Sequence, residues 1–498
     1  MSLARVYSRA QLGVEAPLVE VETHLGPGLP NFNIVGLPDT AVREAKDRVR
    51  SAIINSGFLF PQQRITVNLA PADLPKDGGR FDLAIAVSLL IANGQLRLQQ
   101  MPQQELLGEL ALNGELRPVS GALPAALAAA REERELIVPL ANADEAALSS
   151  GTCIYPAASL TAVCMHLNQS QPIKPYQLPK PATVFSEPTL CLSEVRGQQQ
   201  ARRALEISAS GGHSLLLSGS PGSGKSMLAA RLPGILPPLS EQDALAVAAI
   251  YSITQQRPTH DFFMPPFRAP HHTASAVALV GGSARPRPGE ISLAHAGILF
   301  LDELPEFDRK VLEVLREPME SGVVHISRAA QQTSFPARFQ LVAAMNPCPC
   351  GYLNDPRRGC GYFCEKAKRY QSKLSGPLLD RIDMQLEVSA VKTDELLQQP
   401  LGETSAVVRA RVCRARTRQL ERQGKLNAQL TGREIAPIIA EHEAWLAQVM
   451  ERLNLSARAL HRTLRVARTL ADMTQADRVE QTHLLEAMGF RLTSGIGQ

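Results

Sequence analysis

The sequence Gly-Ser-Pro-Gly-Ser-Gly-Lys-Ser at residues 219–226 constrains the fold of this chain more than any other feature. Its glycines, lysine and serine have the spacing of a phosphate-binding loop, whose backbone N–H groups turn inward toward phosphate oxygens. An apolar run at 213–218 precedes it and a helical pattern follows from Ser226, so the loop is expected to join a parallel strand to a helix. Lys225 is expected to reach the β- and γ-phosphates, and the Ser226 hydroxyl to ligate Mg²⁺. The residues expected to bind ATP are Gly219, Ser220, Pro221, Gly222, Ser223, Gly224, Lys225 and Ser226.

A second motif, Ile298-Leu-Phe-Leu followed by Asp302 and Glu303, predicts a buried central strand that ends in two acids. Open α/β sheets bind ligands at the carboxyl ends of their strands. Asp302 is therefore expected to hold Mg²⁺, and Glu303 to polarise the attacking water. Alone, each motif could be a glycine-rich turn or a strand capped by surface acids. Together they favour ATP hydrolysis over passive binding.

Composition limits the other classes of protein that this chain could be. It has 498 residues, a net charge of +4 and only 4% aromatic residues, which disfavours the stacking of bases on aromatic platforms. Any nucleic-acid binding must depend on local basic patches. No apolar run is long enough to span a membrane and no signal-peptide pattern is present, so we expect a cytoplasmic protein with no membrane partner.

Five prolines between residues 172 and 188 mark the clearest boundary, and we predict a linker at 169–187. Before it, strands such as 64–70 and 135–139 alternate with helices such as 39–55 and 81–92, which predicts a mixed domain at 1–168. After it, strands at 213–218, 297–302 and 339–346 predict a parallel-sheet nucleotide-binding core at 188–395. Residues 396–498 are nearly all helical in pattern.

Four further segments carry a resemblance to a known family. They are Phe267–Ser275 (FRAPHHTAS), Pro288–His295 (PGEISLAH), Asp302–Phe307 (DELPEF) and Leu341–Pro347 (LVAAMNP). In this order they resemble AAA+ ATPases of the magnesium-chelatase and MCM-helicase branch, and most closely the YifB/ComM family, over essentially the whole chain. The resemblance implies an α/β fold: a P-loop AAA+ core with a helical lid, after a Lon-protease-like α+β domain.

The resemblance also implies roles for single residues. Asn346 is similar to the sensor-1 residue that positions water near the γ-phosphate, and Arg381 to the arginine finger that completes a neighbouring subunit's site. Arg458 is similar to the sensor-2 arginine of the lid, although Arg462 and Arg465 on the same predicted helix are alternatives. A shared site of this kind makes activity depend on ring assembly, and the resemblance implies a homo-hexamer.

Two insertions of this branch line the pore of the ring. Residues 257–290 resemble the first, and Val323–Phe335 reads as the second, a hairpin with Arg328 at its turn. Arginines there would contact DNA phosphates without reading bases, although a solvated hairpin charge is the alternative. Adjacent residues such as His271 and His272 diverge, which disfavours joint metal chelation; the resemblance implies a pore or substrate-signalling role, and a structural turn is the alternative. The candidate DNA contacts are Arg268, Arg285, Arg287 and Arg328.

Seven basic residues crowd the segment 407–425, against one glutamate. We expect a helix there that faces solvent or another subunit, with direct DNA contact as the alternative.

Four cysteines lie within 17 residues, at Cys348, Cys350, Cys360 and Cys364. Their density predicts a structural zinc site with four sulfur ligands, while reduced thiols or a disulfide are the alternatives.

The N-terminal domain resembles the Lon proteolytic domain in the segments 108–121 and Lys76-Asp77-Gly78. A Lon protease needs a serine just after the second segment and a lysine just after the first. Here Arg80 takes the place of the serine, and 122–125 reads Ala-Leu-Pro-Ala. The domain is therefore expected to be catalytically degenerate and to bind DNA or scaffold a ring.

These observations lead to one functional prediction: a hexameric, Mg²⁺-dependent ATPase that moves on single-stranded and branched DNA without sequence preference. The resemblance implies branch migration in homologous recombination during natural transformation. The alternative is a magnesium-chelatase-type motor that remodels a protein partner, which DNA would not stimulate.

Overall fold

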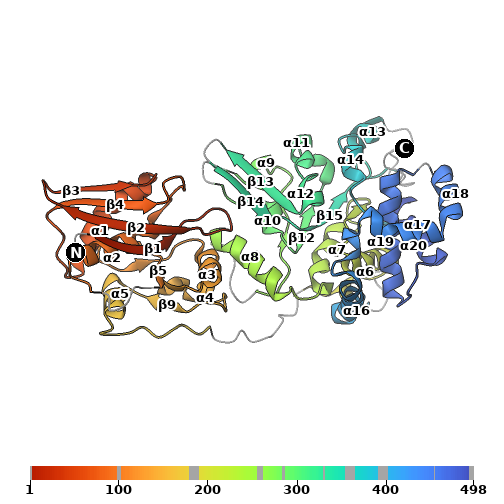
Figure 1. The fold of residues 1–498 in the computed structure, drawn as a ribbon. Helices are drawn as coiled ribbons and strands as arrows, with labels where there is room; N and C mark the ends of the chain where they lie inside the picture. The colour runs from red at the N-terminus through yellow and green to blue at the C-terminus, as the bar shows by residue number, and fades with distance from the viewer. Residues whose placement is uncertain are drawn as a thin grey trace. The chain divides into compact units, whose positions relative to one another are not determined.

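The computed structural model describes residues 3–97, 103–178, 190–254, 262–282, 286–328, 331–353, 365–390, 402–453 and 455–492. The chain folds into two compact units, whose helices and strands are labelled in Figure 1. The N-terminal unit contains residues 3–178 together with 241–262 and the strand residues 331–335, and the C-terminal unit contains the remainder. In the part of the chain that is described, no helix has the length and apolarity needed to cross a membrane.

A seven-stranded mixed sheet, in the order β3-β4-β2-β1-β5-β8-β9, forms the N-terminal unit. Strands β1, β2 and β4 pair antiparallel and bury alternate residues, as the pattern Arg-Ile-Thr-Val-Asn-Leu-Ala of β4 predicts. Helix α2 is buried along nearly its whole length and packs on β1 and β2. The strands are β1 (Leu3–Arg9), β2 (Leu18–Gly26), β3 (Asn31–Val35), β4 (Arg64–Ala70), β5 (Gln104–Leu106), β8 (Glu135–Pro139) and β9 (Ile154–Ala157), with a separate pair β6 (Glu109–Leu110) and β7 (Leu116–Arg117). The helices are α1 (Thr40–Asn55), α2 (Asp82–Ala92), α3 (Ala122–Arg131), α4 (Ala143–Ala146) and α5 (Leu160–Leu167).

Two segments from beyond residue 190 pack within the N-terminal unit, which the sequence did not indicate. Helix α8 (Glu241–Thr254) packs on α3, and the Gly121 N–H donates to the Ser252 carbonyl at 3.1 Å. Strand β14 (Gln331–Pro336) lies so close to Gly13 that a Cβ there would stand 2.4 Å from Thr333 Cγ2. Of the predicted linker, residues 169–178 follow the N-terminal unit, where the Tyr176 N–H donates to the Ile154 carbonyl at 2.7 Å; residues 179–187 lie outside the described residues.

The C-terminal unit has a five-stranded sheet in the order β11-β12-β15-β10-β16, and every pairing in it is parallel. The three central strands read as continuous apolar runs because helices cover both faces, and they are buried throughout. The predicted strands at 213–218, 297–302 and 339–346 are confirmed to within two residues at each end. The strands are β10 (Leu215–Ser218), β11 (Phe267–Arg268), β12 (Ile298–Leu301), β15 (Gln340–Met345) and β16 (Met384–Glu387).

Helices surround this sheet, and the predicted helical pattern at 396–498 is confirmed where the chain is described, at 402–453 and 455–492. α19 packs on α6, α16 and α20, and its apolar side chains share one core with those of the sheet. Near the sheet lie α6 (Gln199–Gly211), α7 (Lys225–Arg231), α9 (Ala276–Val280), α10 (Glu290–Leu293), α11 (Arg309–Glu313), α12 (Pro318–Ser321), α13 (Glu365–Gln371) and α14 (Gly376–Leu379), with β13 (Val323–Arg328) preceding β14. The C-terminal helices are α16 (Ser405–Gln423), α17 (Gly432–Glu441), α18 (Glu443–Leu453), α19 (Ala457–Met473) and α20 (Gln481–Leu492).

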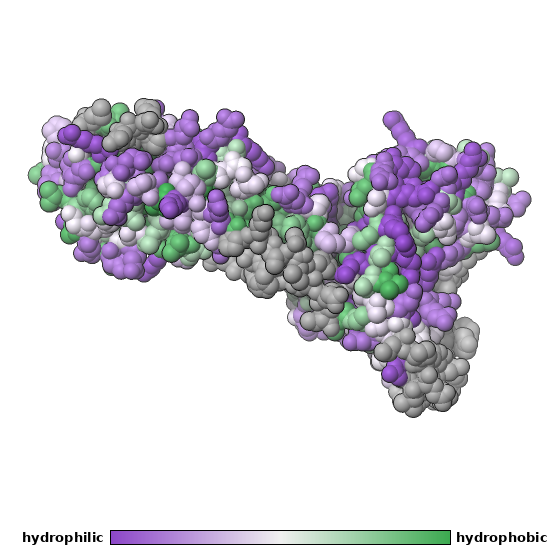
Figure 2. Space-filling view, turned by 90° about the horizontal axis from the view of Figure 1, so that it is seen from below, coloured by the Kyte–Doolittle hydropathy of each residue, from purple (hydrophilic) through white to green (hydrophobic). Residues whose placement is uncertain are grey.

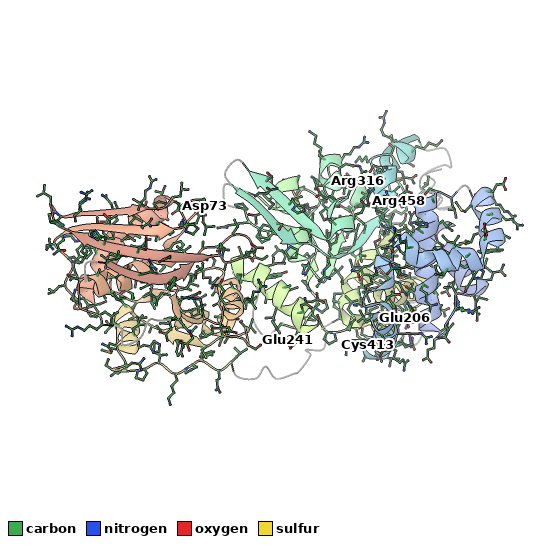
Figure 3. The ribbon with its side chains drawn as sticks, viewed as in Figure 1. Asp73, Glu206, Glu241, Arg316, Cys413 and Arg458 are labelled. Atoms are coloured by element: carbon green, nitrogen blue, oxygen red, sulfur yellow. The ribbon has the colours of Figure 1, made fainter. Side chains whose placement is uncertain are left out.

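The basic segment at 407–425 forms α16, and most of its arginines bond within the unit. Glu206 of α6 and Cys413 of α16, both labelled in Figure 3, mark the two facing helices. Arg411 bonds Glu206 at 2.6 Å, Arg416 donates to the Ala209 carbonyl at 2.8 Å, and Arg422 pairs with Asp472 at 2.5 Å. Figure 2, seen from the side on which α16 lies, shows a hydrophilic band over this part of the unit. These bonds favour a structural role for most of these arginines over contact with DNA.

Candidate nucleotide site

Three predicted site segments meet because parallel strands bring their carboxyl ends to one edge of the sheet. Strand β10 pairs with β15 so that Ser218 lies opposite Met345, and Leu301 of β12 lies opposite Ala343 of the same strand. The residues that follow these strands are the phosphate loop, Asn346, and the pair Asp302-Glu303. The sheet topology therefore gathers at one place the groups that the sequence predicted separately.

The phosphate loop has the backbone that its glycines permit. Gly222 and Gly224 have φ angles of 78° and 87°, in the left-handed region that disfavours side chains. Gly219 is required for space, since a Cβ would stand 2.3 Å from the Val388 carbonyl oxygen. Helix α7 begins at Lys225, so its first N–H groups adjoin the loop.

Lys225 is buried in this loop, with 8% of its surface exposed. Its ammonium donates to the carbonyl oxygens of Gly219 at 2.8 Å and Ser220 at 2.9 Å, and to Asn346 Oδ1 at 3.2 Å. Burial lowers the pKa of Lys225, against the opposing effect of Asp302. A phosphate would bond the ammonium more strongly than these neutral oxygens do, because both partners would then be charged. A phosphate could therefore replace the present hydrogen-bond acceptors of Lys225, one of which is Asn346, the predicted sensor-1 residue.

Ser226 and Asp302 are paired at the place where magnesium is expected. The Ser226 hydroxyl donates to Asp302 Oδ2 at 2.6 Å. A hydroxyl and a carboxylate are both hard oxygen ligands, and Mg²⁺ bound to a nucleotide uses only one or two such protein ligands. The two residues fit this ion and would hold it beside the phosphates.

Glu303 is the most unusual residue of the site. Its φ angle is 52°, a left-handed conformation that is strained for a side chain other than glycine and that is found preferentially at functional sites. Its N–H donates to Asp302 Oδ1 at 2.9 Å, which ties the two acids together. Its half-exposed carboxylate meets His272 Nδ1 at 3.2 Å. The sequence did not indicate this histidine contact.

Arg381 lies where the parallel strands begin, at the ends opposite to those that the phosphate loop follows. Strands β10 and β16 pair in parallel from Leu215 with Met384 to Ser218 with Glu387, so Arg381 precedes the first pair whereas the phosphate loop follows the last. About four strand residues, or roughly 13 Å, separate these two edges. Arg381 therefore lies at the ends of the strands opposite to the phosphate loop of its own chain.

The two arginines named by the resemblance share one carboxylate. Glu320 accepts from Arg381 at 2.9 Å and from Arg458 at 3.1 Å. Burial lowers the pKa of Arg381, against the opposing effect of Glu320. Three nearby guanidinium groups lower it further: Arg458, Arg316 and Arg462, of which Arg458 and Arg316 are labelled in Figure 3. The sequence did not indicate Glu320.

The alternative sensor arginines have structural partners. Arg462 donates to the buried Asp383 at 2.7 Å, and Arg465 donates to the Ala428 carbonyl at 3.1 Å. Asp383 also accepts from the Ser214 N–H at 2.9 Å, so it joins β10, β16 and α19. Although burial raises the pKa of Asp383, Arg462 and His213 more than reverse this and hold it well below its usual range.

The candidate DNA contacts are only partly described. Arg268 forms two bonds of 2.7 Å to Glu290, and Arg287 lies at a turn where its carbonyl accepts from the Gly282 N–H at 3.1 Å. Arg285 lies outside the described residues, and Arg328 ends β13, with its side chain undescribed. Contact of these residues with DNA stays a prediction.

Half of the cysteine cluster is described. Cys348 is buried and Cys350 is exposed, and their sulfur atoms are 3.1 Å apart. Cys360 and Cys364 lie outside the described residues. Among the described residues, no group of three or more His, Cys, Asp or Glu side chains is arranged to hold a metal ion.

In the N-terminal unit, the two segments that resemble Lon lie together. Arg80, at the position expected for a serine, is only 5% exposed and donates to Gln11 Oε1 at 2.7 Å and to the Ser120 carbonyl. Burial lowers the pKa of Arg80 to about 10. Lys76 is fully buried and donates to the Pro71 carbonyl. Arg80 and Lys76 therefore both donate hydrogen bonds to groups within the N-terminal unit.

Three family models match the chain. Those described as magnesium chelatase subunit ChlI match residues 191–396 and 21–142, and the C-terminal model of that subunit matches 402–491. The uncharacterized protein YifB of Salmonella typhimurium is 51% identical over 99% of this chain and 97% of its own. The competence protein ComM of Haemophilus influenzae is 49% identical over 99% of this chain and 98% of its own. The DNA replication licensing factor mcm6 of Xenopus tropicalis is 24% identical over 41% of this chain and 25% of its own.

The family implies ATP and Mg²⁺ as cofactors and ATP hydrolysis as the activity, in agreement with the parallel sheet and the grouping of Lys225, Ser226 and Asp302 at its edge. The full-length matches show that the chain belongs to the YifB/ComM family of magnesium-chelatase-like AAA+ ATPases.

Proposed function

We propose that this chain is a ring-forming motor, built as a homo-hexamer, that couples ATP hydrolysis to movement along branched and single-stranded DNA. Its task would be branch migration during the recombination step of natural transformation, in the cytoplasm. Lys225 would bind the phosphates, Ser226 and Asp302 would hold Mg²⁺, Glu303 would activate water, and Asn346 would position it.

The proposal of a ring depends on one observation: Arg381 and the phosphate loop of the same chain lie at opposite ends of the strands. An arginine at that edge serves a nucleotide only if the nucleotide belongs to a second copy of the chain. Arg458 shares Glu320 with it, so both cations would reach the same neighbouring phosphate. A site completed in this way makes hydrolysis depend on assembly.

Support for DNA as the substrate comes from relatives and from charge. One full-length relative is a competence protein and a partial relative is a replication licensing factor. Arg268, Arg285, Arg287 and Arg328 fall in the two segments that resemble pore insertions. In a ring they would contact phosphates in a manner that is independent of sequence.

The remaining parts would support the motor. The C-terminal helices α16–α20 would form the lid, and four thiolates, Cys348, Cys350, Cys360 and Cys364, would hold a structural Zn²⁺. The N-terminal domain would be a Lon-type domain without proteolytic activity, and it would scaffold the ring or bind DNA.

A mixing experiment tests the shared site. Lys225→Ala and Arg381→Ala should each hydrolyse ATP poorly alone, but an equimolar mixture should regain activity, because some interfaces then combine an intact Lys225 with an intact Arg381. If the mixture stays as inactive as either variant, the shared site is wrong.

The same assay with and without a forked DNA duplex separates the two substrate classes. Stimulation by DNA supports the DNA motor. The alternative is a magnesium-chelatase-type motor that remodels a protein partner, and an ATPase that DNA does not stimulate would support it.

A further inference from the structure

Glu320 stands between two arginines that come from distant parts of the chain. It belongs to the short helix α12, whereas Arg381 precedes strand β16 and Arg458 lies in the first turn of α19. One carboxylate oxygen, Oε1, accepts from Arg381 Nη2 at 2.9 Å and from Arg458 Nη2 at 3.1 Å. The two guanidinium groups are therefore joined through a single oxygen atom.

The charges of this cluster explain why an acid is needed there. Two guanidinium groups that bond the same oxygen carry like charges at close range and repel each other. Burial lowers the pKa of Arg381, Glu320 opposes this effect, and Arg458 adds to it. A third arginine nearby, Arg316, has an acid of its own, Glu313, at 2.5 Å. Without the charge of Glu320, repulsion would drive the Arg381 and Arg458 side chains apart.

The cluster is closed on one side and open on the other. The Arg381 side chain is 8% exposed and also donates from Nη1 to the Pro377 carbonyl at 2.7 Å. The side chains of Glu320 and Arg458 are 45% and 46% exposed. An anion from outside the chain could therefore approach from the side of Glu320 and Arg458. It would meet a net positive charge, because two cations share one carboxylate.

The backbone around Glu320 is fixed independently of the arginines. Gly322 ends α12 with a φ angle of 69°, and its N–H donates to the Pro318 carbonyl at 2.9 Å. Its carbonyl accepts from the Ala337 N–H at 2.8 Å, and a Cβ at Gly322 would stand 2.7 Å from Arg338 Cγ. The place of the acid is therefore set by these bonds, and the arginines are aligned on it.

We propose that Glu320 is a positioning residue whose negative charge holds the guanidinium groups of Arg381 and Arg458 together, so that both reach the phosphates of a nucleotide bound by a second copy of the chain. This inference depends on the proposed role of the two arginines at a neighbouring site. Glu320 acts only through these arginines and takes no part in the chemistry itself.

The first test compares ATP hydrolysis by the full-length parent and by Glu320→Gln, which keeps the shape of the side chain but not its charge. We expect kcat to fall about tenfold, a part of the roughly 10²-fold loss that a misplacement of about 1 Å can cause. Binding of ADP, measured by calorimetry, should not change, because the variant's own phosphate loop is intact. Glu317→Gln, at the exposed residue before α12, is the matched control and should equal the parent in both measurements.

A mixing experiment separates a positioning role from a purely structural one. Each shared site would combine Lys225 of one copy with Glu320 and Arg381 of another. An equimolar mixture of Glu320→Gln and Lys225→Ala should therefore be more active than the mean of the two variants measured alone. A mixture of Glu320→Gln and Arg381→Ala should show no such gain, because both variants are defective on the same side of the shared site.

Three results would overturn the role of Glu320: a parent kcat in Glu320→Gln, a gain on mixing with Arg381→Ala, or no gain on mixing with Lys225→Ala. The mixture of Lys225→Ala and Arg381→Ala shows which proposal has failed. If that mixture stays inactive, the shared site is wrong and the role of Glu320 falls with it. If it regains activity while Glu320→Gln does not complement Lys225→Ala, only the role of Glu320 is wrong.

Discussion

Each unit of this chain contains a buried cation, and the two cations have different surroundings. Arg80 in the N-terminal unit is 5% exposed and Lys225 in the C-terminal unit is 8% exposed, and burial lowers the pKa of both. Arg80 donates to the Gln11 amide oxygen and the Ser120 carbonyl inside its unit, whereas Lys225 lies at the carboxyl ends of parallel strands beside a helix N-terminus. A buried cation thus indicates function only when an incoming anion can replace its partners.

A similar contrast holds for two carboxylates, one buried and one partly exposed. Glu105 of β5 is fully buried between Arg9 of β1 at 2.6 Å and Arg134, which precedes β8, at 2.8 Å, and these bonds join three neighbouring strands of the N-terminal sheet. Asp302 instead bonds a serine hydroxyl and a backbone N–H, both of which can rearrange around a metal ion. Glu105 thus has two cationic partners inside the unit, whereas Asp302 has partners that a metal ion could replace.

The largest expected effect tests this contrast with two lysines. Lys225→Ala should lower kcat for ATP by about 10²–10³, the cost of removing one preorganised donor from a developing charge. Lys76→Met, in the other unit, should leave kcat within about twofold, since Lys76 bonds only an internal carbonyl. Steady-state hydrolysis with Mg²⁺ measures both. An equal loss of kcat in the two variants would contradict the difference between the two buried lysines.

Two buried carboxylates provide the next comparison. Asp383→Asn leaves Arg462 without its charge partner and should destabilise the C-terminal unit by about 3–5 kcal/mol. Trp445, the sole tryptophan, packs on the core of that unit, so its fluorescence in urea reports the transition. Glu105→Gln should leave the Trp445 transition unchanged. A shift as large as that of Asp383→Asn would show that the units unfold together.

The pH dependence of Asp383 follows from the sign of its shift. Its pKa in the folded chain lies below the ordinary 3.8, so the folded state binds its proton less readily than the unfolded state does. Its contribution is complete above pH 3.8 and is lost as the pH falls below that value. The stability difference between the parent and Asp383→Asn should therefore be constant near neutral pH and shrink in acid.

A smaller effect is expected from restoring the serine of the resembled protease. Arg80→Ser leaves the Ser120 carbonyl without its donor and should cost about 1–3 kcal/mol of stability in the N-terminal unit. No casein should be degraded, because 122–125 contains no lysine. Thermal unfolding by circular dichroism measures the first result. Casein cleavage by the variant would contradict the degenerate assignment.

The smallest effect on activity is expected at the cysteine cluster. Purified protein should contain roughly one zinc ion per chain, and Cys348→Ser should lower that content. A closed site with four sulfur ligands has no place for substrate, so kcat should change little while the protein stays folded. Metal content by atomic emission decides the matter, and metal-free parent protein would exclude zinc.

Much of the fold could be predicted from the sequence because local patterns determine it. The predicted strands at 64–70 and 135–139 match β4 and β8 residue for residue, and the predicted helix at 39–55 is α1 with Asp39 as its N-cap. The grouping of Lys225, Asp302 and Asn346 followed from one rule, that parallel strands share a carboxyl edge.

The rest depends on pairing between distant segments, which no local pattern encodes. The contact of His272 with Glu303 needs the register of a two-residue edge strand, and Phe267-Arg268 has no strand periodicity of its own. Glu320 gave no signal because its partners come from two other helical segments. The many arginines of α16 look like a basic surface in sequence, yet most bond carboxylates and carbonyls up to about 200 positions away.

The return of α8 to the first unit limits how this protein can be divided. Ile250 and Tyr251 of that helix are buried, and the chain enters and leaves the first unit again at 331–335. A fragment that starts near residue 190 would carry both segments without the surface that they cover, and should aggregate. Each unit is built from several separate segments of the chain. The ATPase is therefore best studied, and engineered, without truncation.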